Sequence, residues 1–549
     1  MDADTGGVGG RKLMRARALV GALAVASLAI PVRAWAQTES GAEHDHGSSS
    51  AQVGAGEASH WDPGSAEDLP HRASGEIQAR IDAASPGAII AIETGMYHGD
   101  LVVDRAVTLE PDGHVMIVGS GEGSVISVTG EGAVVRGLHV TNSGIGPVGG
   151  PAGIRVEADD VTIEGNLIEA TYMGVAVYGT SGVRLLDNTI RGRGDAAIEG
   201  EAHATSGSAT QGTAPPPGAT GMHDHSEMTG TAPTLGGRPL RGDGVTLWNA
   251  EDAVVRGNTI EHARDGIFMS FGANVLIDRN RVLDSRYALH NMFGLDLFVA
   301  ENTFEGNLSG AVLMYGGPVL LLRNEISGSS SPSTGFGVLL KDVAGVDAVE
   351  NVLLSNRIGI QIDGPAGDLE HETVIHGNTV ALNQYGVSLY PSAHVTFYRN
   401  SFVENTVQVV AQGHGVAGKN TWAFEGIGNY WSDYRGYDLG GEGLGDVPHH
   451  EGGSVESLMV RAPVLQALAS GPAFSLLSAV EDRWVEHESL VVDPLPLMEP
   501  HSPAVGDGVT AGAASAALAA GGLVAVALAG AAIVALRRPL RRGRTSHAT

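Results

Sequence analysis

The sequence predicts an all-β fold, a right-handed parallel β-helix built as a solenoid with coils of about 22 residues. An asparagine recurs after short β-branched stretches, and five of its eight successive gaps are 22 residues long. Alternating apolar and polar residues around it indicate strands, while glycine and asparagine at fixed offsets indicate sharp turns. Leucine-rich repeats share this period, but their leucine ladder and helix are missing here. The repeated positions are Asn166, Asn188, Asn258, Asn280, Asn302, Asn324, Asn351, Asn378 and Asn400.

The composition narrows the functions that this fold could carry. The chain has 549 residues, no cysteine, and 62 acidic against 33 basic residues, so its formal charge is −29. Without thiols it has no disulfide, zinc–thiolate site, iron–sulfur cluster or cysteine nucleophile. Phosphate binding needs a basic face, so nucleic acid is not an expected partner. The 79 glycines, about twice the usual share, suit a solenoid in which glycine turns the corners.

Both ends are predicted to be targeting segments. Residues 1–36 combine a basic start, an apolar run and a small-residue cleavage site, which is typical of a secretory signal peptide. The alternative is a short uncleaved membrane helix. Residues 511–536 carry no charge and are numerous enough to cross a bilayer, and the basic tail 537–549 then lies in the cytoplasm. We therefore expect an extracytoplasmic protein, in the periplasm or on the outer face of the cytoplasmic membrane, with a single-pass anchor.

Between these ends the sequence predicts further divisions. A helically spaced segment, residues 77–84, precedes the first coil and is expected to cap its open apolar end. The expected divisions are a flexible leader (37–72), the β-helix (73–427) with a disordered insertion (194–239), a C-terminal cap motif (428–450), and a capping region with juxtamembrane spacer (451–510).

The first candidate site lies in two consecutive coils. Met292 and Met314 each stand twelve residues after a ladder asparagine, so they should stack about 4.8 Å apart. His290 stands ten residues after the same asparagine as Met292, so its side chain should point to the same side of the strand. Thioether and imidazole together suit Cu(I). An equally good explanation is that the methionines fill the core of the β-helix.

Two arginines share an offset in the same coils. Arg264 and Arg286 each stand six residues after a ladder asparagine, so their guanidinium groups should be stacked. Two adjacent cations need a carboxylate such as Asp265 or another anion between them. We favour a structural salt bridge over an anion-binding site.

A second candidate metal site lies in the insertion, where Met222, His223, His225 and Met228 fall within seven residues. His44 and His46 form a similar pair in the leader. Imidazoles spaced in this way can capture Cu(II) or Zn(II), and we favour weak metal capture for the insertion.

A third candidate is a calcium loop near the end of the β-helix. Asp438, Glu442 and Asp446, with Gly443 between them, fit the spacing of alternating ligands and turns. Gly440 occupies a ligand position and has no side chain to bind a cation. We therefore favour a structural cap in which Trp431 closes the stack of coils.

Several of these segments resemble one family. Residues 429–434 read Asn-Tyr-Trp-Ser-Asp-Tyr and residues 445–448 read Gly-Asp-Val-Pro. Residues 286–292, the Asp-Gly-Ile at 265–267 and the Met-Tyr pair at 314–315 add to the pattern. So do Pro86-Gly87 and the Gly-Met-Tyr at 95–97. Over about residues 73–450 the sequence resembles the NosD family of nitrous oxide reductase maturation proteins.

The resemblance implies a non-catalytic β-helix that handles copper. Family members work with an ABC-type ATPase and permease and with a lipoprotein copper chaperone to assemble the copper sites of nitrous oxide reductase. The sequence departs from the family in its insertion, its histidine-rich segments and its C-terminal membrane helix.

Two other functions stay open from the sequence. Many β-helices are polysaccharide lyases, hydrolases or epimerases, and Asp243, Arg264 and Asp265 could supply the acid, base and cation that such chemistry needs. No aromatic platform for sugar rings is evident beside them. The other possibility is a structural surface solenoid with neither metal nor partner.

Overall fold

The computed structural model describes residues 69–146, 149–193, 241–364, 372–390, 394–411, 420–451 and 491–501, and the backbone of 234–235 and 238–239. These residues do not include the predicted signal peptide, the predicted anchor and its basic tail, or most of the predicted leader and insertion. Within the described part of the chain, no helix is long and apolar enough to span a membrane.

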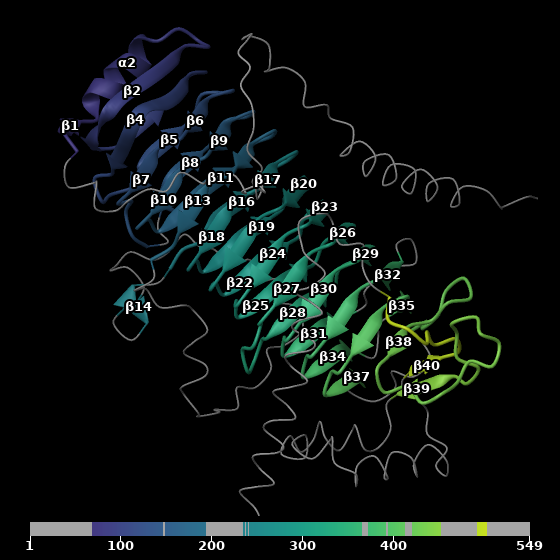
Figure 1. Ribbon diagram of the computed structural model, residues 1–549. Coiled ribbons are helices and arrows are strands. Elements are labelled where there is room, and N and C mark those ends of the chain that lie inside the picture. Colours follow the sequence, from purple (N-terminus) through teal and green to yellow (C-terminus); the bar gives the residue numbers. More distant parts are fainter. Residues whose placement is uncertain are drawn as a thin grey trace, which may run out of the picture. The chain divides into compact units, whose positions relative to one another are not determined.

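The chain forms a parallel β-helix, as the repeat predicts, and its coils succeed one another along the stack in Figure 1. A typical coil contributes two strands to a 24-stranded sheet and one longer strand to a 12-stranded sheet, and all pairings within both sheets are parallel. The 12-stranded sheet consists of β3 (Leu101–Val103), β5 (Ile126–Val128), β8 (Ala152–Val156), β11 (Met173–Tyr178), β16 (Val245–Trp248), β19 (Asp265–Ser270), β22 (Tyr287–Met292), β25 (Ser309–Met314), β28 (Phe336–Lys341), β31 (Ile358–Asp363), β34 (Tyr385–Leu389) and β37 (Val407–Ala411).

The 24-stranded sheet carries two rows of short strands, which the long strands β2 and β4 join at the N-terminal end. It consists of β1 (His71–Ala73), β2 (Ile89–His98), β4 (Thr108–Val118), β6 (Val134–Arg136), β7 (His139–Thr141), β9 (Thr162–Glu164), β10 (Leu167–Glu169), β12 (Arg184–Leu186), β13 (Thr189–Arg191), β17 (Val254–Arg256), β18 (Thr259–Glu261), β20 (Ala273–Asp278), β21 (Arg281–Leu283), β23 (Leu295–Ala300), β24 (Thr303–Glu305), β26 (Val319–Leu322), β27 (Glu325–Ser327), β29 (Val346–Val349), β30 (Val352–Leu354), β32 (Thr373–His376), β33 (Thr379–Ala381), β35 (Val395–Tyr398), β36 (Ser401–Val403) and β38 (Tyr430–Trp431).

The core lies inside the coils, where apolar side chains stack on one another. Val245, Ile267, Leu289 and Ala311 are register partners in four successive coils, and all four are fully buried. Because alternate residues of a strand point to opposite faces, the residues between these positions face away from the core. The 12-stranded sheet therefore has one apolar inner face and one outer face that is available for chemistry.

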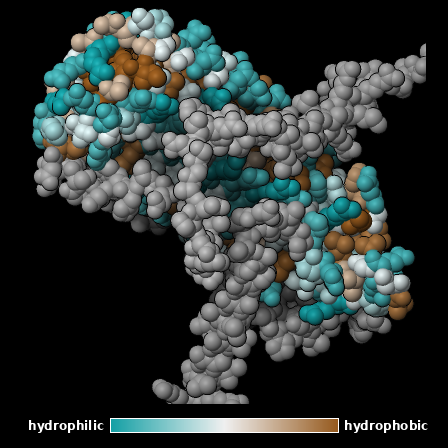
Figure 2. Space-filling view, turned by 45° about the horizontal axis from the view of Figure 1, so that its top comes forward, coloured by the Kyte–Doolittle hydropathy of each residue, from teal (hydrophilic) through white to brown (hydrophobic). Residues whose placement is uncertain are grey.

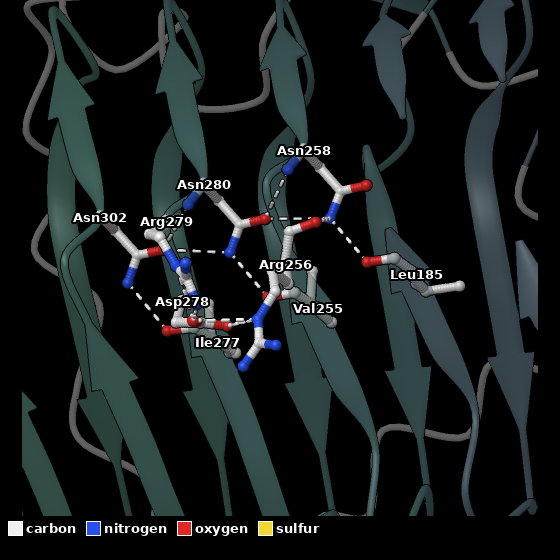
Figure 3. A network of polar contacts seen from close by, with 9 residues as sticks. All are labelled: Leu185, Val255, Arg256, Asn258, Ile277, Asp278, Arg279, Asn280 and Asn302. Carbon is white, nitrogen blue, oxygen red and sulfur yellow. Dashed lines mark hydrogen bonds and ion pairs between the residues drawn. The ribbon is translucent and has the colours of Figure 1, made fainter. Parts of the chain in front are cut away.

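The predicted asparagine ladder is confirmed (Figure 3). Asn280 Oδ1 accepts hydrogen bonds from the backbone N–H and the side-chain amide of Asn258, at 3.0 and 2.9 Å, and the next asparagine repeats the pattern. The amide nitrogen of Asn280 also donates to the Val255 carbonyl at 2.8 Å. The ladder continues through Asn429 to the carboxylate of Asp493. It satisfies buried polar groups at one corner of every coil that it crosses.

A second ladder, which the repeat in the sequence did not predict, follows the first by five residues. Asn383 Oδ1 accepts from the backbone of Asn356, and Asn405 Oδ1 accepts from Asn383. Serine replaces asparagine at Ser285 and Ser329, and each serine donates its backbone N–H to the asparagine of the next coil. These serines interrupt the repeat in the sequence.

The expectation that glycine turns the corners is only partly right. Gly257 has a positive φ of 68° before its ladder asparagine, but Arg279 and Glu301 adopt the same conformation one and two coils later. Other glycines are required by close packing instead. A Cβ at Gly244 would collide with the Ile260 side chain and with the backbone of the next coil.

Both ends of the stack are capped, and Figure 2 shows apolar patches near each of them. At the N-terminal end α2 (Gly75–Ala83) buries Ile77 and Ile81, in the segment where a helix is predicted. At the C-terminal end Trp431 is buried and stacks on Phe402 at 4.5 Å between ring centroids. The prediction that Trp431 closes the coil stack is therefore confirmed.

Two short antiparallel pairs stand apart from the coils. β39 (His449–Glu451) pairs with β40 (Val491–Asp493) beside the C-terminal cap. β14 (Thr234–Leu235) pairs with β15 (Arg238–Pro239) inside the insertion. The expectation of disorder throughout the insertion is therefore wrong for its last residues.

Candidate metal centre

The first candidate site lies on the outer face of the 12-stranded sheet. In β22, Leu289 and Asn291 are fully buried, so His290 and Met292 between and after them point outward. Met292 is the register partner of Met314 on β25, which confirms the predicted stacking. Both methionines are half-buried. They do not fill the core, so that alternative is wrong.

His290 is oriented by a buried carboxylate. Its Nδ1 lies 2.8 Å from Oδ2 of Asp265, which is fully buried at the start of β19. The rings of Tyr287 and Phe268 lie 5.2 and 5.3 Å from the imidazole, between centroids. The side chain of His290 is only 12% exposed. Because Nδ1 is engaged by Asp265, Nε2 is the ring nitrogen that remains to bind a metal ion.

The two stacked arginines form the expected structural salt bridges. Arg264 binds Asp243 through Nε and Nη2, both at 2.8 Å. Arg286 binds Asp265 in the same bidentate way, again at 2.8 Å. Each arginine therefore pairs with an aspartate of the preceding coil, and Asp265 holds Arg286 and His290 at once.

The charges of this cluster are fixed at neutral pH. Burial raises the pKa of Asp265, but its hydrogen bonds with His290 and Arg286 outweigh burial and hold the pKa well below the usual range. The charge of Asp243 raises the pKa of Arg264. Both arginines are therefore protonated, and His290 faces an ionised carboxylate.

An exposed row of aromatic side chains follows this site at the next corner. Trp248, Phe271, Phe293 and Tyr315 come from four successive coils and are each at least 38% exposed. Neighbouring ring centroids are 5.6, 5.1 and 5.3 Å apart. Phe271, Phe293 and Tyr315 have φ between 56° and 58°, which is unusual for bulky residues. The Nζ of Lys341 lies 6.0 Å from the ring centre of Tyr315.

The row lies at the opposite end of the strands from Asp243 and Asp265, so it does not accompany these carboxylates. The sequence held a signal for it, because Phe271, Phe293 and Tyr315 each stand thirteen residues after a ladder asparagine. Phe293 lies 6° from parallel to Phe271 and 18° from parallel to Tyr315. The rings thus cover one another's faces and turn their edges to solvent. Sugar rings stack on open aromatic faces, which this row offers only at its ends.

The third candidate, the calcium loop, already has internal partners for its carboxylates. Asp438 accepts hydrogen bonds from the backbone of Gly441 at 2.6 Å, Glu442 at 3.2 Å and Gly443 at 2.7 Å. Hydrogen bonds from the backbone, that of Gly443 first, lower the pKa of Asp438. Asp446 accepts from the backbone of Leu439 at 2.6 Å. These aspartates hold the turns of the cap. The second candidate, Met222, His223, His225 and Met228, lies outside the described residues.

The sequence is similar to a family model and to two proteins of known name. Residues 224–436 match a family model described as periplasmic copper-binding protein (NosD). A Pseudomonas aeruginosa protein, named probable ABC transporter binding protein NosD, is 26% identical over 414 residues, which cover 73% of this chain and 85% of that protein. A protein of the same name from Stutzerimonas stutzeri is 23% identical over 461 residues, covering 80% and 89%.

Solved β-helix structures are similar to the chain at lower identity. The catalytic domain of a GH87 α-1,3-glucanase in complex with nigerose has a TM-score of 0.38 and 13% identity, and the match covers 68% of this chain and 70% of that one. The periplasmic alginate epimerase AlgG has a TM-score of 0.36 and 12% identity, covering 61% and 70%. The family model, the two relatives and the motifs in the sequence all support the NosD family for this chain.

Proposed function

We propose that this chain is a non-catalytic, extracytoplasmic accessory protein that carries copper for the copper sites of nitrous oxide reductase. In this proposal Cu(I) is its cargo, and His290, Met292 and Met314 are the ligands. The observation that carries the proposal is the register pairing of the two methionines beside a histidine that a buried aspartate orients. The family description and the names of the relatives support copper, a periplasmic location and an ABC transporter as partner.

The ligand set favours Cu(I) over other ions. Thioether sulfur is a soft donor that binds Cu(I) well and binds calcium or magnesium poorly. The hydrogen bond to Asp265 fixes the tautomer in which Nδ1 carries the proton and Nε2 carries the lone pair. Such carboxylate–histidine pairs are typical of metal ligands and raise the basicity of the ring.

The position of the site suits a carrier. All three ligands lie on the outer face of the sheet, and both methionines are half-buried, so a partner can reach a bound ion. The aromatic row begins with the residue after each methionine, Phe293 and Tyr315. We propose that a lipoprotein copper chaperone delivers the ion here and that nitrous oxide reductase receives it. The anchor predicted at residues 511–536 would hold the exchange at the membrane.

Asp243 and Asp265, the carboxylates that suggested a polysaccharide-active enzyme, do not support that function in the structure. Asp243 and Asp265 are 3% and 0% exposed, and each is locked in a bidentate arginine pair. A general acid or base must reach the substrate and exchange a proton with it. Neither aspartate is free to do so.

A Cu(I) titration of the full chain under anaerobic conditions, against a chromophoric Cu(I) chelator, tests the proposal. The variant His290→Gln/Met292→Leu/Met314→Leu should bind one equivalent fewer than the unaltered chain. Asp265→Asn should weaken that equivalent by roughly 10- to 100-fold, as loss of a partner behind a metal ligand does. The matched control is Met269→Leu, because Met269 is fully buried in the core. Equal binding by the triple variant and the unaltered chain would overturn the proposal.

A further inference from the structure

Four residues of the first coils form a row on four neighbouring strands of the 24-stranded sheet. His71 on β1 is the register partner of Met96 on β2. Met96 is the partner of Met116 on β4, and Met116 is the partner of His139 on β7. Neighbouring strands lie about 4.8 Å apart. The row therefore places two thioethers side by side with an imidazole at each end.

The row faces away from the core. Tyr97, Ile117 and Val140, the next residues along three of the strands, all belong to the hydrophobic core. Alternation then turns Met96, Met116 and His139 to the outer side. Core packing, the ordinary role of a buried methionine, does not explain them.

The end of the row formed by Met116 and His139 is nevertheless shielded from water. Met116 is 7% exposed and His139 is 4% exposed, although both lie on the outer side of the sheet. The pairing of β2 with β4 shifts register between Glu93 and Gly95. The extra residues of β4 at this irregularity include His114, which stands two residues before Met116. A third imidazole thus lies beside the row.

The two imidazoles at the ends of the row are held in place by partners. Nε2 of His139 lies 3.0 Å from Oε1 of Glu169, the same kind of carboxylate–histidine contact that orients His290. Nδ1 of His71 lies 2.9 Å from Nε2 of His98, and the two rings are stacked. A histidine whose ring is already oriented loses less freedom when it binds a metal ion.

We propose that this row is a second site for a soft metal ion, with His71, Met96, Met116 and His139 as its candidate ligands. Two thioethers and two imidazoles, without a carboxylate in the row, match Cu(I) and do not match calcium, magnesium or manganese. The site stands on its own geometry and does not depend on the function proposed for His290, Met292 and Met314. If both sites exist, the β-helix binds two soft ions at separate places on its outer surface.

A spectroscopic experiment reads this site residue by residue. The full chain is labelled with ¹³C in the methionine methyl groups and titrated with Ag(I), which mimics Cu(I) without redox chemistry. Single Met→Leu variants assign the signals. We expect the signals of Met96 and Met116 to shift together with one equivalent of bound ion, while the core residue Met269 does not respond. Unchanged Met96 and Met116 signals at saturating Ag(I) would overturn the site.

Counting bound ions separates this site from the first one. In the Cu(I) competition titration, Met96→Leu/Met116→Leu should bind one equivalent fewer than the unaltered chain and should melt within a few degrees of it. His139→Gln should weaken the same equivalent at least tenfold. A row variant that binds as many ions as the unaltered chain would contradict the inference, whatever the outcome for the variant at His290, Met292 and Met314.

Discussion

The inside and the outer face of the coils follow different rules. At the inner corner an asparagine recurs coil after coil, and each one bonds to the asparagine of the next coil. On the outer face of the 12-stranded sheet, four successive register partners are Thr246, Phe268, His290 and Val312. Buried polar groups must all be paired, so the inside repeats the same pairing in every coil. Outer side chains need not repeat from coil to coil, and a local combination of them points to function.

Among substitutions that test this comparison, one in the inner asparagine ladder should lower the free energy of unfolding most. Asn302→Ala removes both hydrogen bonds that Asn280 donates to Asn302, and both that the Asn302 amide donates onward, to Ile277 and Asn324. Several buried polar groups then lack partners, at about 1–3 kcal/mol each. We expect the free energy of unfolding to fall by about 4 kcal/mol, measured by chemical denaturation.

The control is an exposed ion pair at the neighbouring strand. Arg281 and Glu305 are each about half exposed and lie 2.8 Å apart. Arg281→Ala should change the free energy of unfolding by about 0.5 kcal/mol or less, since exposed pairs contribute little. If the two variants lose similar stability, the ladder is no more important than the surface.

The next effect concerns Asp265, an outer group that is as deeply buried as the ladder. Asp265→Asn leaves Arg286 without its carboxylate and loosens His290, so we expect a loss of about 3 kcal/mol at pH 7. The pKa of Asp265 lies below the unfolded value of about 3.9. Its contribution is therefore complete above about pH 4 and declines as the pH falls further, because only the unfolded chain then takes up the proton.

Denaturation curves at several pH values check this expectation. The stability of the unaltered chain and of Asp265→Asn should differ most near neutral pH and converge as the solution is acidified below pH 4. A difference that stays constant down to pH 2 would mean that the aspartate acts through packing and not through its charge.

The sequence was sufficient to predict the coils because the inner positions repeat with the coil length. Met292 and Met314 are separated by one coil length of 22 residues, as are most neighbouring ladder asparagines, so the spacing alone predicted that they stack. The contact between Asp265 and His290 joins residues 25 positions apart and runs diagonally between coils. No repeated offset reveals such a contact, so the sequence predicts Asp265 as a partner of the stacked arginines but does not show that it orients His290.

The row of His71, Met96, Met116 and His139 in the N-terminal coils could not be predicted from spacing either. Met96 and Met116 are 20 residues apart, and Met116 and His139 are 23 apart. These first coils differ in length, and the register shift between β2 and β4 alters the count again. Where coil length varies, register depends on the detailed pairing of strands, which spacing alone does not give.

The smallest effect is expected at the aromatic row. Phe293 is 40% exposed and holds a φ of 58°, a conformation that asparagine tolerates better than phenylalanine. Phe293→Asn loses ring contacts with Phe271 and Tyr315 but relieves backbone strain, so stability should change by about 1 kcal/mol or less.

The matched interior variant is Phe304→Ala, which empties a fully buried position and should cost about 3–5 kcal/mol. Parallel melts compare the two. A cost for Phe293→Asn as large as that for Phe304→Ala would mean that the row holds the coils together, whereas a small cost leaves recognition as the reason for keeping strained, exposed rings beside the methionines.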